Sequence, residues 1–419
     1  MSTAALAPLR HAPFRWLAAA RAVNQLGNAV APIALAFAVL DLGFSTAQLG
    51  VVVAARSIPN VVFLLVGGVI ADRMSRPVVL IGSSALSFLT QAAVAVLVLE
   101  RVHGLGWLIA LSAANGALAA LARPASSAIT RYTVPAERLR PAIVLLRLGV
   151  NLAAAVGAAA GAGLVAWIGS GWGIAVDAVS FAVAGGCFAA MELALRGAAA
   201  DPPGGTAAHP PERQHPLRDL AEGWREVASR EWIWVIVAQF LVLNACFSGI
   251  LSVLGPVIAD ATFGRAQWGL IIGAEALGLV VGGFVAMRWR PRHAIGAGVA
   301  VLVLWAAPLA VLGLSPEVPL LVALFFIAGA ATEQFEVAWD AALQHHVPPD
   351  RLARVYSYDA LGSFAAIPIG QIVAGPLAAA FGAREVMVGA SVATVLVTLA
   401  ALARRSVRTV KDGNEPHAH

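Results

Sequence analysis

The sequence predicts an all-α membrane protein with twelve transmembrane helices in two pseudo-symmetric six-helix bundles, both termini being cytoplasmic. Three observations predict this fold: an apolar composition, short charged loops between long apolar runs, and a partial repeat of the chain. Of the 419 residues, 59% are hydrophobic and only 12% are charged, and the mean hydropathy is +0.81. Soluble domains carry about 25% charged residues. A soluble fold of this length could not bury so much apolar surface, so that class is excluded.

The apolar runs have the length of membrane-spanning helices, which need roughly 20 mostly apolar residues. Clusters of charged residues, proline and glycine separate one run from the next. The breaks predict helices at 15–40, 47–71, 78–99, 106–130, 141–166, 173–195, 231–258, 267–287, 294–313, 319–343, 355–380 and 385–403.

The loop charges predict the orientation. Arginines follow every even-numbered helix, whereas the opposite side holds only Arg101, Arg265 and Arg384. Positive residues concentrate in cytoplasmic loops, so we expect both termini to be cytoplasmic. The 27 arginines against one lysine suggest a GC-rich bacterial genome, and we therefore expect a multi-pass protein of the bacterial cytoplasmic membrane. The positive residues behind the net charge of +5 lie in short loops between apolar segments, where they set the orientation of the chain in the lipid bilayer. No nucleic-acid partner is therefore expected.

The halves of the chain repeat. Val134-Pro-Ala-Glu-Arg-Leu matches Val347-Pro-Pro-Asp-Arg-Leu, and further glycine matches keep nearly the same offset. The polar stretch in the middle is rich in proline and glycine, as flexible linkers are. We therefore expect an N-terminal bundle at 1–196, a cytoplasmic linker at 197–230, a C-terminal bundle at 231–404 and a tail at 405–419.

A charged loop follows the second predicted helix and reads Gly68-Val-Ile-Ala-Asp72-Arg73-Met-Ser-Arg76. It resembles the loop after the second helix of the major facilitator superfamily, whose pattern is Gly-x-x-x-Asp-Arg-x-Gly-Arg-Arg/Lys. Ser75 and Pro77 depart from that pattern. The parallel six-plus-six repeat is typical of the same superfamily.

The resemblance implies a cytoplasmic gate formed by Gly68, Asp72, Arg73 and Arg76. The Asp72 carboxylate would cap the positive N-terminus of the eleventh helix, which we expect to begin near Tyr356. Arg73 and Arg76 also have a simpler interpretation as anchors of membrane topology. Arg123 aligns with Glu336 at the repeat offset, which suggests an ion pair between the halves and adds Arg123 to the gate. The repeated loop in the C-terminal half carries Met287 where the acid would be. The gate is therefore expected to belong mainly to the N-terminal half.

Several acidic residues fall inside predicted spans, and four of them are the candidates for proton coupling. A charge near the bilayer centre costs at least ~2.5 kcal/mol and marks a functional candidate. Glu333, Glu336 and Asp340 occupy one face of the tenth helix by their spacing, and Glu275 stands alone in the eighth. Such close carboxylates cannot all ionise cheaply, so we expect them to bind protons. Solvation near the helix end is the alternative for Asp340, and binding of a cationic substrate is the alternative for Glu333 and Glu336.

Polar side chains in other predicted spans are candidates for substrate binding. The alternative for each amide is a hydrogen bond between helices. The candidates are Asn24, Gln25, Arg147, Asn151, Asn244 and Trp339.

Within the superfamily, the Gly-Gly-Val-Ile-Ala-Asp-Arg run and the Val-Pro-x-x-Arg-Leu segment are similar to the bacterial macrolide and siderophore exporters. The resemblance implies proton-coupled efflux of a small amphipathic molecule. Gly157-Ala-Ala-Ala-Gly161 resembles the Gly-Pro-x-x-Gly antiporter signature, with Ala158 in place of the proline.

Two other functions stay open: uptake of a sugar or organic anion, with Arg147 and Arg123 binding the substrate, and a membrane scaffold or sensor. No phosphate-binding loop, nucleophile motif or metal-ligand cluster is found. We therefore expect that the protein is not an enzyme and has no cofactor or metal. We also expect it to be a monomer.

Overall fold

The computed structural model describes residues 6–71, 75–198, 225, 227–289, 291 and 293–410. Asp72, Arg73 and most of the predicted linker lie outside these residues. The described chain is built of helices in two compact units, Met1–Leu42 with Ala55–Gln214, and Gly43–Ala54 with His215–His419. Each unit is described by itself below.

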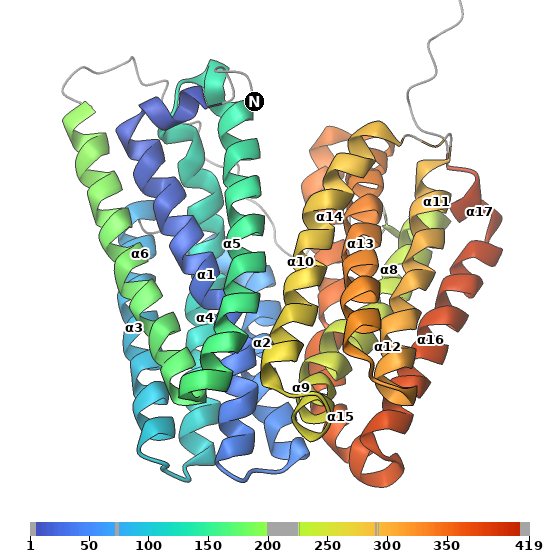
Figure 1. Ribbon diagram of the computed structural model, residues 1–419. Helices are drawn as coiled ribbons and strands as arrows, with labels where there is room; N and C mark the ends of the chain where they lie inside the picture. Colours follow the sequence, from blue (N-terminus) through green and yellow to red (C-terminus); the bar gives the residue numbers. More distant parts are fainter. Residues whose placement is uncertain are drawn as a thin grey trace, which may run out of the picture. The chain divides into compact units, whose positions relative to one another are not determined.

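The first unit contains five long helices and the larger part of a sixth, α2, whose first turns up to Ala54 belong to the second unit (Figure 1). Helix α1 packs against α5 and α6, and α3 packs against α4 and α6. Short 3-10 helices precede α1 and join α4 to α5. The long helices are α1 (Ala12–Asp41), α2 (Thr46–Ala71), α3 (Arg76–Leu99), α4 (Leu105–Ile129), α5 (Leu139–Ile168) and α6 (Ser170–Ala198).

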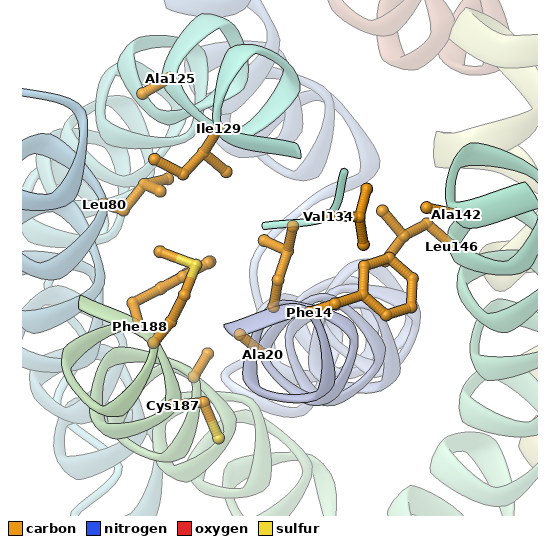
Figure 2. Packing of buried hydrophobic residues seen from close by; sticks show 13 residues of the cluster. Phe14, Ala20, Leu80, Ala125, Ile129, Val134, Ala142, Leu146, Cys187 and Phe188 are labelled. Atoms are coloured by element: carbon orange, nitrogen blue, oxygen red, sulfur yellow. The ribbon is translucent and has the colours of Figure 1, made fainter. Parts of the chain in front are cut away.

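Apolar side chains from five of these helices form a core at one end of the unit (Figure 2). Phe14 and Leu17 from α1, and Met191 from α6, are all 0% exposed. They meet Leu80 from α3 and Ile129 from α4. Burial of side chains of this size stabilises a fold by about 1.5–3 kcal/mol each, so this core fixes the positions of α1 and α6, which carry polar residues further along.

The second unit differs because three of its spanning segments are interrupted. The seventh consists of α8 (Glu231–Leu243), a π-helical stretch (Asn244–Ile250) and α9 (Leu251–Ala261). The ninth consists of α11 (Ala294–Val301), a 3-10 turn (Leu302–Trp305) and α12 (Ala306–Leu314). The eleventh breaks between α14 (Pro349–Phe364) and α15 (Ala366–Phe381). The uninterrupted helices are α10 (Arg265–Arg288), α13 (Val318–His346), α16 (Ala383–Ala403) and the short α17 (Arg405–Arg408).

The break in the eleventh segment has a local cause. Pro368 has no N–H to donate to the carbonyl of Phe364, so the α-helical ladder cannot continue through this turn. The predicted start of this helix at residue 355 was six residues too late. Helix α14 begins at Pro349, because proline is favoured at the first position of a helix, where no N–H partner is needed.

Glycines allow close packing of helices around these interruptions. A Cβ atom at Gly370 of α15 would overlap the carbonyl oxygen of Ala245 in the π-helical stretch and lie 3.0 Å from the Cα atom of Gly249. A Cβ atom at Gly282 of α10 would lie 2.6 Å from the carbonyl oxygen of Ala330 in α13. Backbone therefore packs on backbone at both places.

The prediction of twelve spanning segments is confirmed. Twelve helices or helical runs of the described residues are long and apolar enough to cross a membrane. Their ends agree with the predicted ones to within a few residues, apart from the start of α14.

Candidate functional site

The second unit encloses a cavity of about 480 Å³ among α8, the π-helical stretch, α10, α13 and α14. This volume lies in the range of small-molecule pockets, about 300–1,000 Å³. Four carboxylate side chains and a row of aromatic rings line the cavity. The geometry of these groups defines the candidate site.

The four carboxylates come from three helices. Glu275 is on α10, Glu336 and Asp340 are on α13, and Asp359 is on α14. The position of Glu275 is fixed by close backbone packing, because a Cβ atom at Gly329 of α13 would overlap the carbonyl oxygen of Glu275. The proton-coupling candidates Glu275, Glu336 and Asp340 thus meet at one cavity.

Hydrogen bonds fix two of these acids. The indole Nε1–H of Trp339 donates to Oδ2 of Asp359 at 3.0 Å, and the hydroxyl of Ser363 donates to Oδ1 at 3.2 Å. The Tyr356 hydroxyl donates to Oδ1 of Asp340 at 3.1 Å. Side chains of α13 and α14 therefore hold both carboxylates in place.

Aromatic rings form a continuous row along the cavity. Phe247 stacks on Trp305 with centroids 4.4 Å apart, and Trp305 meets Phe240 edge-on at 6.3 Å. Phe240 then stacks on Phe335 at 4.6 Å, and Phe335 stacks on Trp339 at 5.9 Å. The row begins at the π-helical stretch and ends beside Asp359.

The two irregular turns supply part of this row. The π-helical stretch carries Asn244, Phe247 and Ser248 into the lining, and the 3-10 turn carries Trp305. Single π-helical turns inside α-helices are rare and are frequent at functional sites. Asn244 donates to the carbonyl oxygen of Ser363 at 3.0 Å and accepts from Ser248 at 3.3 Å. This substrate-binding candidate therefore borders the cavity and also makes the interhelical bond considered as its alternative.

Glu333 occupies a different position from its two neighbours on α13. Its side chain is 9% exposed and faces Gly283 of α10, where an added Cβ atom would lie 3.7 Å from Oε1. It is not among the residues that line the cavity. Of the three acids on this helix, Glu336 and Asp340 line the cavity and Glu333 does not.

The first unit holds the remaining polar candidates. Arg56 of α2 donates to Oδ1 of Asn28 at 2.8 Å, and Asn28 donates to Oδ1 of Asn24 at 2.5 Å. Gln25 is half-buried beside Asn24 on α1. Arg123 of α4 is exposed and lies within electrostatic range of Arg56.

A buried acid lies near this chain of hydrogen bonds. Asp177 of α6 is 0% exposed and its Oδ2 accepts a hydrogen bond from Gln91 of α3. Oδ1 is 2.6 Å from the position that a Cβ atom would take at Gly27 of α1, so only glycine fits there. Arg56 lies within electrostatic range of this carboxylate.

Arg147 borders a second cavity of about 550 Å³, which Arg21 and Arg131 also line. Arg21 is held by Ser126 of α4 and by Thr130 of the following 3-10 helix, its Nε donating to Oγ of Ser126 at 3.1 Å. Asn151 is half-buried one turn further along α5.

The gate candidates are only partly described. Asp72 and Arg73 lie outside the described residues, and the surroundings of Gly68, near the end of α2, are not described either. Arg76 begins α3 and places its guanidinium 5.1 Å from the centre of the Tyr132 ring, against which Arg131 also packs at 4.9 Å.

Sequence reasoning missed part of the site. Asp359 is a carboxylate inside a predicted span, the same signal that identified Glu275, but it was not among the predicted site residues. The roles of Tyr356, Phe240 and Trp305 carried no such signal, because aromatic residues are common in spanning helices.

Twelve helices of spanning length and a cavity lined by carboxylates and aromatic rings inside one helical unit define a multi-pass membrane protein of the transporter class. The family model "Major Facilitator Superfamily" matches residues 17–358 and 261–418. The chain belongs to the major facilitator superfamily, as the sequence resemblance implied.

Curated relatives cover most of the chain at low identity. The multidrug efflux pump Tap of Mycobacterium tuberculosis (strain ATCC 25618 / H37Rv) is 26% identical over 390 residues, 91% of each chain. The enterobactin exporter EntS of Citrobacter koseri is 28% identical over 301 residues, 70% of this chain and 67% of the relative.

Solved structures share the fold. The nucleoside transporter NupG superimposes with a TM-score of 0.70 at 14% identity, covering 93% of this chain and 98% of that one. A bacterial homolog of the human lysosomal transporter Spinster gives a TM-score of 0.70 at 16% identity, covering 98% of each chain.

Proposed function

We propose that this protein is a proton-coupled exporter of small amphipathic molecules that works by alternating access. The observation that carries the proposal is the cavity of about 480 Å³ in the second unit, which combines four carboxylates with a row of aromatic rings. The carboxylates supply groups that bind and release protons, and the rings supply apolar surface. The printed functions of the Tap and EntS relatives, drug efflux and enterobactin export, support export as the direction.

The proton-coupling step is assigned to Glu275 and Glu336, with Asp340 and Asp359 held beside them by hydrogen bonds. A proton on one of these acids changes the charge of the cavity by one unit. Such a change shifts the equilibrium between the two access states when one of them binds the proton more tightly than the other. Binding of substrate and of protons at one cavity provides the coupling between them.

The gate assignment remains a proposal from the sequence. Asp72, with Gly68, Arg73 and Arg76, is proposed to stabilise the state that is closed on the cytoplasmic side, both termini being cytoplasmic. Arg123 is proposed to contribute from α4. The protein is proposed to act as a monomer in the bacterial cytoplasmic membrane.

One observation favours a second candidate, the uptake of an organic anion. The cavity of about 550 Å³ in the first unit is bordered by Arg21, Arg131 and Arg147, and grouped arginines attract carboxylates and phosphates. Uptake and export predict opposite directions of flux under one gradient.

Purified protein in proteoliposomes with an acidic lumen tests the proposal. Addition of a transported compound outside should release protons from the lumen, read with a trapped pH indicator, while the compound accumulates inside. Glu275→Gln should abolish the coupled signal, and Glu317→Gln, an exposed acid at the start of α13, should retain it. Compound uptake without proton release, or no gradient-linked flux across a broad compound set, would contradict proton-coupled export.

A further inference from the structure

We infer that the cavity of the second unit binds amphipathic organic cations, with the positive group against its carboxylates and an apolar ring system along its aromatic row. This inference rests on the proposed export function and names the substrate class of the same site. Three features of the cavity lining carry the inference: its negative charge, hydrogen-bond donors that bond within the protein, and its aromatic surface.

The charge of the lining is one-sided. Glu275, Glu336, Asp340 and Asp359 border the cavity, and its described lining contains no Arg, Lys or His side chain. In a region of low dielectric constant such charges interact far more strongly than in water. An anionic ligand would meet only repulsion here, whereas a cation gains attraction from several directions.

The donors of the lining are already engaged within the protein. The indole N–H groups of Trp305 and Trp339 donate to Thr332 at 2.9 Å and to Asp359 at 3.0 Å. The hydroxyls of Tyr356 and Ser363 donate to Asp340 and Asp359.

Most donors of the other polar side chains are engaged as well. Thr332 donates to the carbonyl oxygen of Ala328 at 2.9 Å, and Ser248 donates to Asn244 at 3.3 Å. Asn244 uses one amide hydrogen on the carbonyl of Ser363. The wall therefore offers mainly acceptors, so the ligand has to bring the donors or the positive charge.

The aromatic row supplies the complementary surface. The rings of Phe247, Trp305, Phe240, Phe335 and Trp339 follow one another with centroid separations between 4.4 and 6.3 Å. Because both indole N–H groups point into the protein, the tryptophans contribute ring surface rather than donors. Cations are attracted to the faces of such rings, most strongly to tryptophan.

A pair of probes with matched shape isolates the effect of charge. Tetraphenylphosphonium and tetraphenylborate are both tetrahedral with four phenyl rings, but they carry opposite charges. Binding to the full-length protein in detergent is measured by isothermal titration calorimetry, with the empty detergent titrated as a blank. Tetraphenylphosphonium should bind at least tenfold more tightly than tetraphenylborate. Equal binding of the two ions, or preference for the borate, would overturn the inference.

Two variants locate the binding site. Glu336→Gln and Asp359→Asn should each weaken tetraphenylphosphonium binding at least tenfold, while the matched control Glu317→Gln should bind as the unchanged protein does. Size-exclusion profiles and thermal unfolding establish that each variant is folded, and either folded variant suffices for the test. Unchanged binding in the folded variants would exclude this cavity as the cation site.

Failure of the inference and failure of the proposed function give different results. Gradient-linked export of neutral or anionic compounds, without cation binding, would refute the inference and leave the export function intact. Tight cation binding that depends on Glu336, without gradient-linked flux of any compound, would refute the transport proposal and leave the cation site intact.

Discussion

Trp339 of α13 donates its indole hydrogen to Asp359 of α14 at 3.0 Å, and this bond joins two helices at the wall of the cavity. The second oxygen of Asp359 accepts from Ser363, so the carboxylate is oriented by one donor on each side. The bond also turns the face of the indole ring toward the aromatic row, where it stacks on Phe335.

Replacement of Trp339 by phenylalanine should lower the stability of the protein. The ring surface is largely kept, but a hydrogen bond to a carboxylate is lost, which costs about 1–3 kcal/mol. We expect a lower thermal unfolding temperature in detergent. Trp167→Phe is the matched control, because Trp167 is 86% exposed on α5. Equal unfolding temperatures for the two variants would show that the bond to Asp359 contributes nothing.

Gly370→Ala should disturb the packing of α15 on the π-helical stretch. The new methyl group would overlap the carbonyl of Ala245, and such overpacking costs about 1–3 kcal/mol. Gly389→Ala in α16 is the control, since its methyl group would meet nothing within 4 Å and alanine is the better helix former. Thermal unfolding should separate the variants, with Gly370→Ala the less stable. A Gly370→Ala variant as stable as the control would contradict the close approach.

Gln91→Leu should destabilise the first unit. It removes the side-chain donor to Oδ2 of Asp177, a residue that is 0% exposed, and a buried acceptor left unsatisfied costs about 1–3 kcal/mol.

The double variant Gln91→Leu/Asp177→Leu provides the control for that prediction. It removes both polar partners, so it should lose less stability than the sum of the two single changes, as residues in contact do. Additive losses in thermal or denaturant unfolding would show that Gln91 and Asp177 are not coupled.

Proton coupling should depend on position along α13. Glu336→Gln removes an acid that lines the cavity, and Glu333→Gln removes one that faces α10 instead. In proteoliposomes, we expect Glu336→Gln to abolish substrate-induced proton release and Glu333→Gln to keep at least half of it. The reverse order would place the coupling acid at the contact between α10 and α13.

Asp72→Asn tests the gate that the sequence predicts. Loss of a carboxylate that stabilises one access state should slow turnover about tenfold, while equilibrium binding of tetraphenylphosphonium stays unchanged. Asp260→Asn, an acid paired with Arg265 at 2.7 Å and far along the chain from the gate loop, should transport normally. Normal turnover in Asp72→Asn would refute the gate assignment.

The helices were predictable because the length of an apolar run is a direct consequence of bilayer thickness. The acids were predictable for a similar reason, since a carboxylate within an apolar segment needs a function or a partner. The separation of Glu333 from Glu336 was not predictable, because three residues along a helix leave them about 60° apart. The edge of the cavity falls between them.

The aromatic row could not be predicted from the sequence either. Its order depends on the π-helical stretch at Asn244–Ile250 and the 3-10 turn at Leu302–Trp305, which change the direction of Phe247 and Trp305 relative to a regular helix. No residue type in these stretches requires such turns. They arise from tertiary packing, including the contact of Gly249 with Gly370.

The internal engagement of the donors in the cavity wall has a consequence for selectivity. A wall that presents hydrogen-bond donors accepts only ligands whose acceptors match them in direction, and it rejects close analogues. Ring faces and carboxylates are less demanding, because dispersion and charge attraction vary gradually with ligand shape. The protein should therefore discriminate poorly among ligands of similar charge and hydrophobicity. A compound that differs from a bound ligand in a single substituent should still bind.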